Sequence, residues 1–200
     1  MNLVICEGII SAGKSQLTKS LSELMNASAD YEPVETNRYL ELFYKDPKRW
    51  ALEMQFYMMS FRYESHLRAI EHIWKTKQVH VADRSIYGDY AFALLNYRLG
   101  NISELGMQSY NNMRDVMLRT LLTPQVCIWL DVDPAVALQR IPTRGRTCEN
   151  AITLDYLIGL RECYQIVISE LKERGCHVVN IGWDEFKSTE FVFEKIREYL

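Results

Sequence analysis

The sequence predicts an α/β fold in which a parallel sheet is flanked by helices on both faces. Two observations support this: short apolar runs that suit buried strands, and helical patterns that alternate with them along the chain. In sheets of this kind ligands bind at the carboxyl ends of the strands. A chain of 200 residues, 48% of them hydrophobic, is long enough for one well-buried domain and short for two. We therefore expect residues 1–200 to form a single domain.

The individual elements follow from local patterns. Strands are predicted where short, buried-type runs occur, at Leu3–Cys6, Val79–Ala82, Gln125–Leu130 and Cys176–Ile181, with a weaker candidate at Ser28–Val34. Helices are predicted where apolar residues recur every three or four positions, at 15–24, 50–75, 89–99, 102–121, 134–140, 153–174 and 188–200. The patterns assign no helix or strand to residues 35–49.

Composition excludes several classes of function. The net charge of −3 disfavours a nucleic-acid partner, because duplexes are bound by clustered Lys and Arg. The five cysteines are odd in number and lack CxxC spacing, so neither a disulfide framework nor a zinc site is expected. No apolar run approaches the roughly 20 residues that span a bilayer, and the first residues do not resemble a signal peptide. We expect a cytoplasmic protein that acts on a small molecule.

A phosphate-binding motif follows the first predicted strand. Gly8-Ile9-Ile10-Ser11-Ala12-Gly13-Lys14-Ser15 matches G-x-x-x-x-G-K-[ST] throughout. Glycines let backbone N–H groups point at phosphate oxygens, and the next helix adds its positive end. A chance turn with a surface lysine is disfavoured, because a strand and a helix flank the motif. We predict a P-loop NTPase fold that binds ATP through Gly8, Ser11, Ala12, Gly13, Lys14, Ser15 and Gln16.

Two acidic positions suit phosphoryl transfer. Glu32 precedes a proline, which favours an extended backbone, and a carboxylate near a developing alkoxide can accept its proton. Asp83 ends the second clear strand, where it can hold Mg²⁺ together with Ser15, and Arg84 can orient Glu32 and neutralise phosphoryl charge. The alternatives are a solvated loop glutamate and an aspartate that caps the next helix.

Five segments, in order, resemble the deoxynucleoside kinase family, in particular its bacterial and viral branch. They are the P-loop, Glu32-Pro33-Val34, Gln55-Phe56-Tyr57, Asp83-Arg84-Ser85 and Arg144-Gly145-Arg146, and they extend over nearly the whole chain. The resemblance implies a homodimer that transfers the γ-phosphate of ATP, with Mg²⁺, to the 5′-hydroxyl of a deoxynucleoside for dNTP salvage. The resemblance implies that Glu32 is the catalytic base and that Lys14 and Arg84 are the other catalytic residues.

The same resemblance implies how the base is bound. Gln55 and Arg62 are seven residues apart, two helical turns, and so share one helix face. In the family the glutamine binds the base edge, and the arginine works with an aspartate that matches Asp89. This pair is typical of members that act on deoxyadenosine, deoxyguanosine or deoxycytidine. Met58 stands where many members have a smaller residue, so the base preference stays open. The alternative is an ordinary polar stripe on an amphipathic helix.

Further positions match the sugar site and the ATP site. Tyr44 and Glu149 match the residues that bind the sugar 3′-hydroxyl, and Phe92 is expected to stack on the base. The alternatives are an aromatic that packs at a loop and an exposed charge. A short arginine-rich lid is expected at about 140–151, with Arg140, Arg144 and Arg146 closing over ATP. A loop after the last strand is expected to bind adenine through Glu185 and Phe186.

Two departures concern the lid. Pro142 would remove a hydrogen bond from a helix interior, so the lid is expected to begin or hinge differently from the common pattern, and Arg140 is affected most. Cys148 replaces an acidic residue that is common beside Glu149.

Two rival functions stay open at this point. A nucleoside monophosphate kinase, of the thymidylate type, would share the P-loop and the Asp-Arg strand end, but it would need further cations for the phosphate of its acceptor. A nucleotide-binding relative without catalysis would keep the fold alone. Intact Lys14, Ser15, Glu32, Asp83 and Arg84 argue against the latter.

Overall fold

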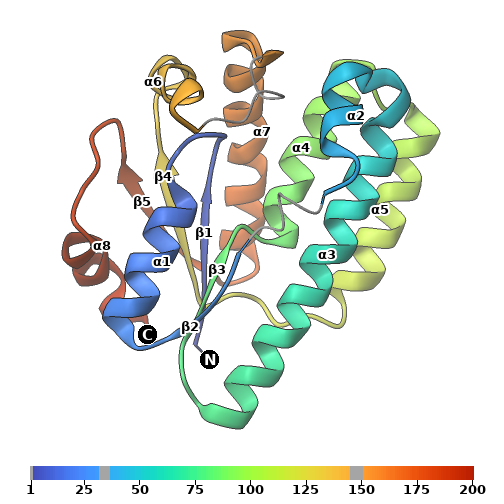
Figure 1. The fold of residues 1–200 in the computed structure, drawn as a ribbon. Helices are drawn as coiled ribbons and strands as arrows, with labels where there is room; N and C mark the ends of the chain where they lie inside the picture. The colour runs from blue at the N-terminus through green and yellow to red at the C-terminus, as the bar shows by residue number, and fades with distance from the viewer. Residues whose placement is uncertain (1, 32–36, 145–150) are drawn as a thin grey trace.

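A five-stranded parallel sheet forms the centre of the protein. The computed structural model describes residues 2–31, 37–144 and 151–200 (Figure 1). The strands lie in the order β2-β3-β1-β4-β5, and every neighbouring pair is parallel. They are β1 (Leu3–Gly8), β2 (Ser28–Asp30), β3 (His80–Asp83), β4 (Val126–Asp131) and β5 (His177–Gly182).

Helices connect the strands in the manner of a doubly wound sheet. They are α1 (Lys14–Met25), α2 (Leu40–Lys45), α3 (Pro47–Thr76), α4 (Ile86–Arg98), α5 (Glu104–Leu118), α6 (Pro134–Arg140), α7 (Leu154–Glu173) and α8 (Thr189–Ile196). Single 3₁₀ turns cover Pro142–Arg144 and Arg197–Tyr199. Within the described ranges, no helix combines the length and the apolarity needed to cross a bilayer.

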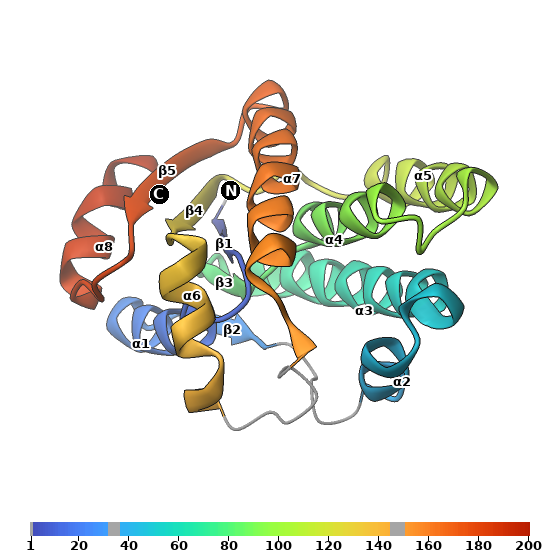
Figure 2. The ribbon, with the colours of Figure 1, turned by 90° about the horizontal axis from the view of Figure 1, so that it is seen from above.

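The helices form a layer on each face of the sheet. Figure 2 shows α1 and α8 on one face, with α3, α4 and α7 on the other. The central strand β1 is buried along its whole length, as expected for a parallel strand covered on both sides. Because β1 pairs with β3 on one side and β4 on the other, the loop after β1 lies at the point where the strand order reverses, which is where ligands bind in such sheets.

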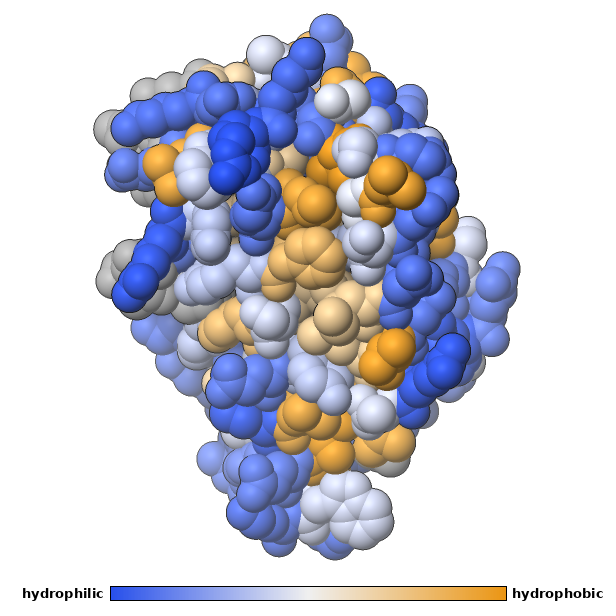
Figure 3. All heavy atoms as spheres, turned by 90° about the vertical axis from the view of Figure 1, so that its right-hand side faces the viewer, coloured by the Kyte–Doolittle hydropathy of each residue, from blue (hydrophilic) through white to orange (hydrophobic). Residues whose placement is uncertain are grey.

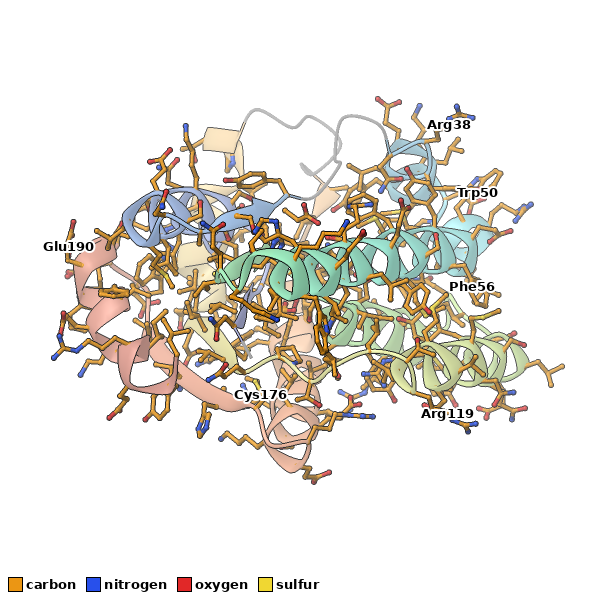
Figure 4. The ribbon with its side chains drawn as sticks, turned by 90° about the horizontal axis from the view of Figure 1, so that it is seen from below. Arg38, Trp50, Phe56, Arg119, Cys176 and Glu190 are labelled. Carbon is orange, nitrogen blue, oxygen red and sulfur yellow. The ribbon has the colours of Figure 1, made fainter. Side chains whose placement is uncertain are left out.

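Outside the sheet, α3 and α5 run alongside each other and extend the molecule. Phe56 lies between them, with its ring centroid 6.0 Å from that of Tyr110 (Figure 4). The face that carries these helices shows a band of apolar side chains bordered by polar ones (Figure 3). Helix α3 also packs against α2 and α4, so these helices are held together beside the sheet.

The α/β prediction is confirmed, and most predicted elements begin and end within three residues of the observed ones. Part of the weak strand prediction is borne out as β2, whereas residues 32–36 lie outside the described residues. The helix α2 was missed. It has six residues, too few for a clear apolar period, and only Phe43 is buried. The next helix starts at Pro47, earlier than predicted, because Asp46 accepts a hydrogen bond from the Arg49 N–H.

Candidate active site

A cavity of about 490 Å³ opens at the carboxyl end of β1. Its walls come from the P-loop with the start of α1, from α2, α3 and α4, from the ends of α6 and α7, and from the loop after β5, and fourteen of the predicted residues line it. On the phosphate side these are Ser11, Gly13, Lys14, Ser15, Gln16, Arg84, Arg140 and Phe186, and on the other side Tyr44, Gln55, Met58, Arg62, Asp89 and Phe92.

The P-loop has the geometry of an anion site. Gly13 is left-handed, with φ of 89°, and in the described structure no side chain caps the start of α1 after it. The first N–H groups of α1 therefore face the loop, where they carry the positive end of the helix dipole. Buried Lys14 donates to the Ile9 carbonyl over 2.7 Å, inside the same loop. Gly8 and Ala12 support the loop from behind, since a Cβ on Gly8 would lie 3.1 Å from both the Leu130 carbonyl oxygen and the Ala12 Cβ.

A hydroxyl and a carboxylate meet beside the P-loop. The Ser15 hydroxyl donates to Oδ2 of Asp83, which ends β3. The other oxygen of Asp83, Oδ1, is buried and has no hydrogen-bond partner in the described part of the chain. Buried carboxylate oxygens usually have partners, so this one suits a ligand such as a hydrated divalent cation.

Arg84 is held in an unusual conformation at the same edge. Its φ is 70°, in the left-handed region that residues other than glycine seldom adopt. One guanidinium nitrogen, Nη1, donates to the Gly8 carbonyl over 3.0 Å and to the Tyr164 hydroxyl over 2.5 Å. The guanidinium also lies 4.9 Å from the ring centroid of Phe92. Arg84 therefore borders the cavity between the P-loop and Phe92.

Beneath Arg84 lies Glu7, a buried acid that the sequence analysis did not single out. Its Oε1 accepts from the Ser85 hydroxyl over 2.6 Å, and its Oε2 accepts from the Tyr164 hydroxyl over 3.0 Å. Burial raises the pKa of Glu7, while Arg84 and these hydrogen bonds oppose the rise. The signal in the sequence is a glutamate directly after an apolar strand run, and because the predicted strand ends at Cys6, Glu7 was not expected in the core.

On the far side of the cavity, a buried ion pair links two helices. Arg62 of α3 donates through Nε to Oδ1 of Asp89 over 2.7 Å and through Nη1 to the Asp83 carbonyl over 3.1 Å. Both side chains of the pair are 4% exposed. Gln55 is equally buried, and its Oε1 has no hydrogen-bond partner among the described residues. The predicted stripe on α3 thus faces the cavity and offers an unsatisfied acceptor to a ligand.

Three more residues complete this side. Tyr44 and Phe92 line the cavity as predicted positions, and the Phe92 ring meets Tyr164 edge-on. Met58 also lines it, and the amide of Asn37 donates to the Met58 sulfur over 3.2 Å. Asn37 was missed because its neighbours have no strand or helix pattern.

The chain belongs to the deoxynucleoside kinase family. A family model described as deoxynucleoside kinase matches residues 4–199. A deoxyguanosine kinase of Dictyostelium discoideum is 40% identical over 97% of this chain and 68% of its own length. A deoxyadenosine kinase of the same organism is 31% identical over 97% of this chain and 77% of its own length. A solved deoxyadenosine kinase from M. mycoides with bound dCTP superposes with a TM-score of 0.84 and 26% identity, over 98% of this chain and 99% of that one.

As a member of this family, the protein is an enzyme that phosphorylates deoxynucleosides with ATP. The P-loop NTPase fold that the motif predicted is the fold of its structural neighbours. The family match favours this reaction over both the monophosphate kinase and the non-catalytic alternative. We call the side that carries the P-loop the phosphate half and the side that carries Gln55, Arg62 and Asp89 the base half, after the roles proposed for them below.

One end of the phosphate half, called the adenine end after the role proposed below, is formed by the loop after β5. Arg140 Nη2 donates to the carbonyls of Trp183 and Asp184 over 3.1 and 2.6 Å, and its guanidinium lies 4.2 Å from the Phe186 ring centroid. Helix α6 ends at Arg140, so Pro142 stands in the following 3₁₀ turn and not in a helix interior. Glu185 does not line the cavity; its side chain is 89% exposed and pairs with Lys187 over 3.7 Å.

Some predicted positions lie outside the description. Glu32, Arg146, Cys148 and Glu149 fall in the ranges that the structure does not describe, and Arg144 is described only as part of the 3₁₀ turn. The roles assigned to these residues stay predictions.

Proposed function

We propose that the preferred acceptor is a purine deoxynucleoside, with deoxyguanosine first, and that ATP phosphorylates its 5′-hydroxyl. The observation that carries this proposal is the base half: a buried Arg62–Asp89 pair beside Gln55, whose Oε1 has no partner in the described structure. The 40% identity to a deoxyguanosine kinase supports the same choice.

The donors and acceptors of this half suit guanine best. Guanine presents two neighbouring acceptors, O6 and N7, toward the wall that carries Arg62. Nε and Nη1 of Arg62 already donate to Asp89 and to the Asp83 carbonyl, so the base would meet the remaining N–H groups of the guanidinium. The N1–H of guanine suits the unsatisfied Oε1 of Gln55. Adenine presents an amino group in place of O6, which would face the donors of Arg62 and would need Asp89 as its acceptor. We therefore rank deoxyadenosine second, deoxycytidine third and thymidine last.

The remaining roles follow from position and resemblance. The P-loop N–H groups and Lys14 would hold the β- and γ-phosphates of ATP, with Arg140, Arg144 and Arg146 closing over them. Phe186, which lines the cavity, would border adenine. Glu32 would accept the proton of the 5′-hydroxyl, with Arg84 neutralising charge on the phosphoryl group. Tyr44 and Glu149 would bind the 3′-hydroxyl, and Phe92 would stack on the base.

Magnesium fits the Ser15–Asp83 corner. Asp83 offers a buried, unsatisfied oxygen there, and Ser15 offers a hydroxyl. No group of three or more metal-binding His, Cys, Asp or Glu side chains occurs among the described residues, which suits an ion held largely by phosphates and water. When bound, Mg²⁺ would neutralise charge on the β- and γ-phosphates.

We further propose that residues 1–200 act as one catalytic domain with a lid at about 140–151, that the enzyme is a homodimer, and that it is cytoplasmic. Exposed apolar side chains on α5, such as Leu105 and Val116, support the association of two copies of this chain. Cys6, Cys127, Cys163 and Cys176 are free thiols, which suits a reducing compartment. Light scattering coupled to size exclusion would test the dimer, and a monomeric mass would contradict it.

An ATP-coupled assay against the four deoxynucleosides, cytidine, uridine and the corresponding monophosphates tests the function. We expect kcat/KM to be highest for deoxyguanosine and at least tenfold lower for thymidine. Preferred turnover of a monophosphate would contradict the acceptor class, and preference for thymidine would contradict the base assignment. Glu32→Gln tests the role of Glu32 as the catalytic base. Turnover should fall by about 100-fold or more, and wild-type turnover in this variant would contradict that role.

A further inference from the structure

We propose that Glu7 and Tyr164 are positioning residues that hold the Arg84 guanidinium at the edge of the phosphate half. Neither side chain lines the cavity, so both act through Arg84. The proposal concerns how the kinase reaction is supported and does not depend on which base is preferred.

The contacts form an ordered chain from strand to cavity. Tyr164 of α7 accepts from Nη1 of Arg84 over 2.5 Å and donates its own proton to Oε2 of Glu7 over 3.0 Å. A hydroxyl has one proton, so while Arg84 donates to it, that proton is directed to Glu7. The carboxylate thereby fixes the orientation of the Tyr164 hydroxyl, and the hydroxyl fixes one nitrogen of Arg84.

The second oxygen of Glu7 anchors the backbone next to Arg84. Oε1 accepts from the Ser85 hydroxyl over 2.6 Å. The same hydroxyl oxygen caps α4 by accepting from the N–H groups of Tyr87 and Gly88, over 3.2 and 3.3 Å. Arg84 immediately precedes this cap and has a left-handed backbone, so Glu7 supports Arg84 at both its side chain and its main chain.

Burial makes this network rigid. Glu7 and Tyr164 are 1% and 0% exposed, and Tyr164 packs against Trp129 with ring centroids 4.9 Å apart. A Cβ built on Gly88 would lie 2.3 Å from one oxygen of Glu7 and 2.5 Å from the other, so α4 has a glycine where the carboxylate fits. Glu7 is held by Ser85, which follows β3, and by Tyr164 of α7, and it lies in the field of the charges of Arg84 and Arg62. Such fully satisfied buried networks specify one geometry.

The position of the Arg84 guanidinium needs to be fixed because the side chain has another favourable position nearby. Arg84 also lies over Phe92, 4.9 Å from its ring centroid, and a long side chain released from Tyr164 could settle further toward that ring. Its charge would then be farther from the phosphoryl group in the transition state. Because charge stabilisation depends steeply on placement, we expect loss of the hydroxyl to lower kcat and to leave substrate binding intact.

Tyr164→Phe tests the proposal, with Tyr110→Phe as a matched control. Both residues are 0% exposed, but the Tyr110 hydroxyl has no hydrogen-bond partner among the described residues and does not line the cavity. We expect kcat of Tyr164→Phe to fall by about tenfold or more, with KM for ATP and for the deoxynucleoside within about twofold of wild type. Tyr110→Phe should retain wild-type kcat.

A second variant keeps the test valid if Tyr164→Phe folds poorly. Glu7→Gln has the same shape and should lower kcat similarly, and the double variant should be no worse than the worse single one, because the residues act in series. Equal kcat in Tyr164→Phe and Tyr110→Phe, additive losses in the double variant, or a rise in KM alone would each overturn the proposal. The kinase function itself is judged separately, by turnover of the wild-type enzyme.

Discussion

The phosphate half and the base half of the site are built in different ways. The phosphate half is centred on eight consecutive residues, Gly8 to Ser15, whose backbone N–H groups and one lysine are the proposed phosphate ligands. In the base half, Tyr44, Arg62 and Asp89 come from three helices and meet only through packing. On the proposed assignment, ATP binding depends on one contiguous segment, whereas selection among bases depends on how α3 and α4 are held together.

The two halves also respond differently to the loss of a charge. Lys14 serves any triphosphate, so its removal should affect all acceptors equally. Arg62 and Asp89 compensate each other's buried charge, and removing one leaves the other without its partner inside the protein. A change in the base half should therefore alter both stability and specificity. Four experiments follow, from the largest expected effect to the smallest.

Lys14→Ala should have the largest effect. Without this cation the transition state loses charge stabilisation, and we expect kcat/KM to fall by about 1000-fold, roughly 4 kcal/mol, for every deoxynucleoside alike. Steady-state kinetics with each acceptor would measure it. Lys19→Ala, an exposed position on the same helix, is the control and should keep wild-type rates. An effect confined to one base would contradict the separation of the two halves.

Asp89→Asn should lower both the activity with the preferred purine and the stability of the protein. We expect kcat/KM for the preferred purine to fall by about 100-fold and the free energy of unfolding to fall by about 3 kcal/mol, because Arg62 loses its buried partner. Denaturant unfolding and the four-nucleoside assay would measure both. Unchanged relative rates among the bases would show that the pair has only a structural role.

Acid should lower the free energy of unfolding through His66, which lies on α3 together with Gln55 and Arg62. Burial lowers the pKa of His66 to about 4, and its ring donates to the Leu122 carbonyl over 2.9 Å. Below about pH 6.5 the unfolded chain binds a proton that the folded chain refuses, so stability should fall as the pH drops from 6.5 to 4, by roughly 2–3 kcal/mol.

His66→Gln should remove most of this pH dependence, and His177→Gln, at an exposed position, should keep it. Urea unfolding at pH 7.5, 5.5 and 4.5 would measure the slope. An equal slope in His66→Gln and wild type would assign the acid sensitivity to other groups.

Phe186→Ala should have the smallest effect. Its ring borders the adenine end of the cavity and lies beside the Arg140 guanidinium. We expect KM for ATP to rise by about tenfold, roughly 1.4 kcal/mol, with the order of base preference unchanged. Phe191→Ala, on exposed α8, is the control. A change in base preference would mean that the two halves are coupled.

Much of the fold was predictable because its signals are local. The apolar runs of β1, β3, β4 and β5 and the apolar periods of the long helices lie in continuous segments. Helix α2 was not predictable in this way, since six residues do not complete two turns and its place depends on packing against α3. Glu7 and Asn37 were missed because their partners lie far away in the sequence.

The sequence alone determined the strand–helix alternation and the phosphate loop, because each depends on contiguous residues with a direct physical meaning. It also indicated the family, through five short segments in a fixed order. Only the tertiary structure decided that Arg62 meets Asp89, that Asp83 accepts from Ser15 with one carboxylate oxygen and keeps the other unsatisfied, and that Glu7 reaches Arg84 through Tyr164. These contacts join residues that are separated by tens of positions. Their free energy comes from burial that exists only once the sheet and its helices have assembled.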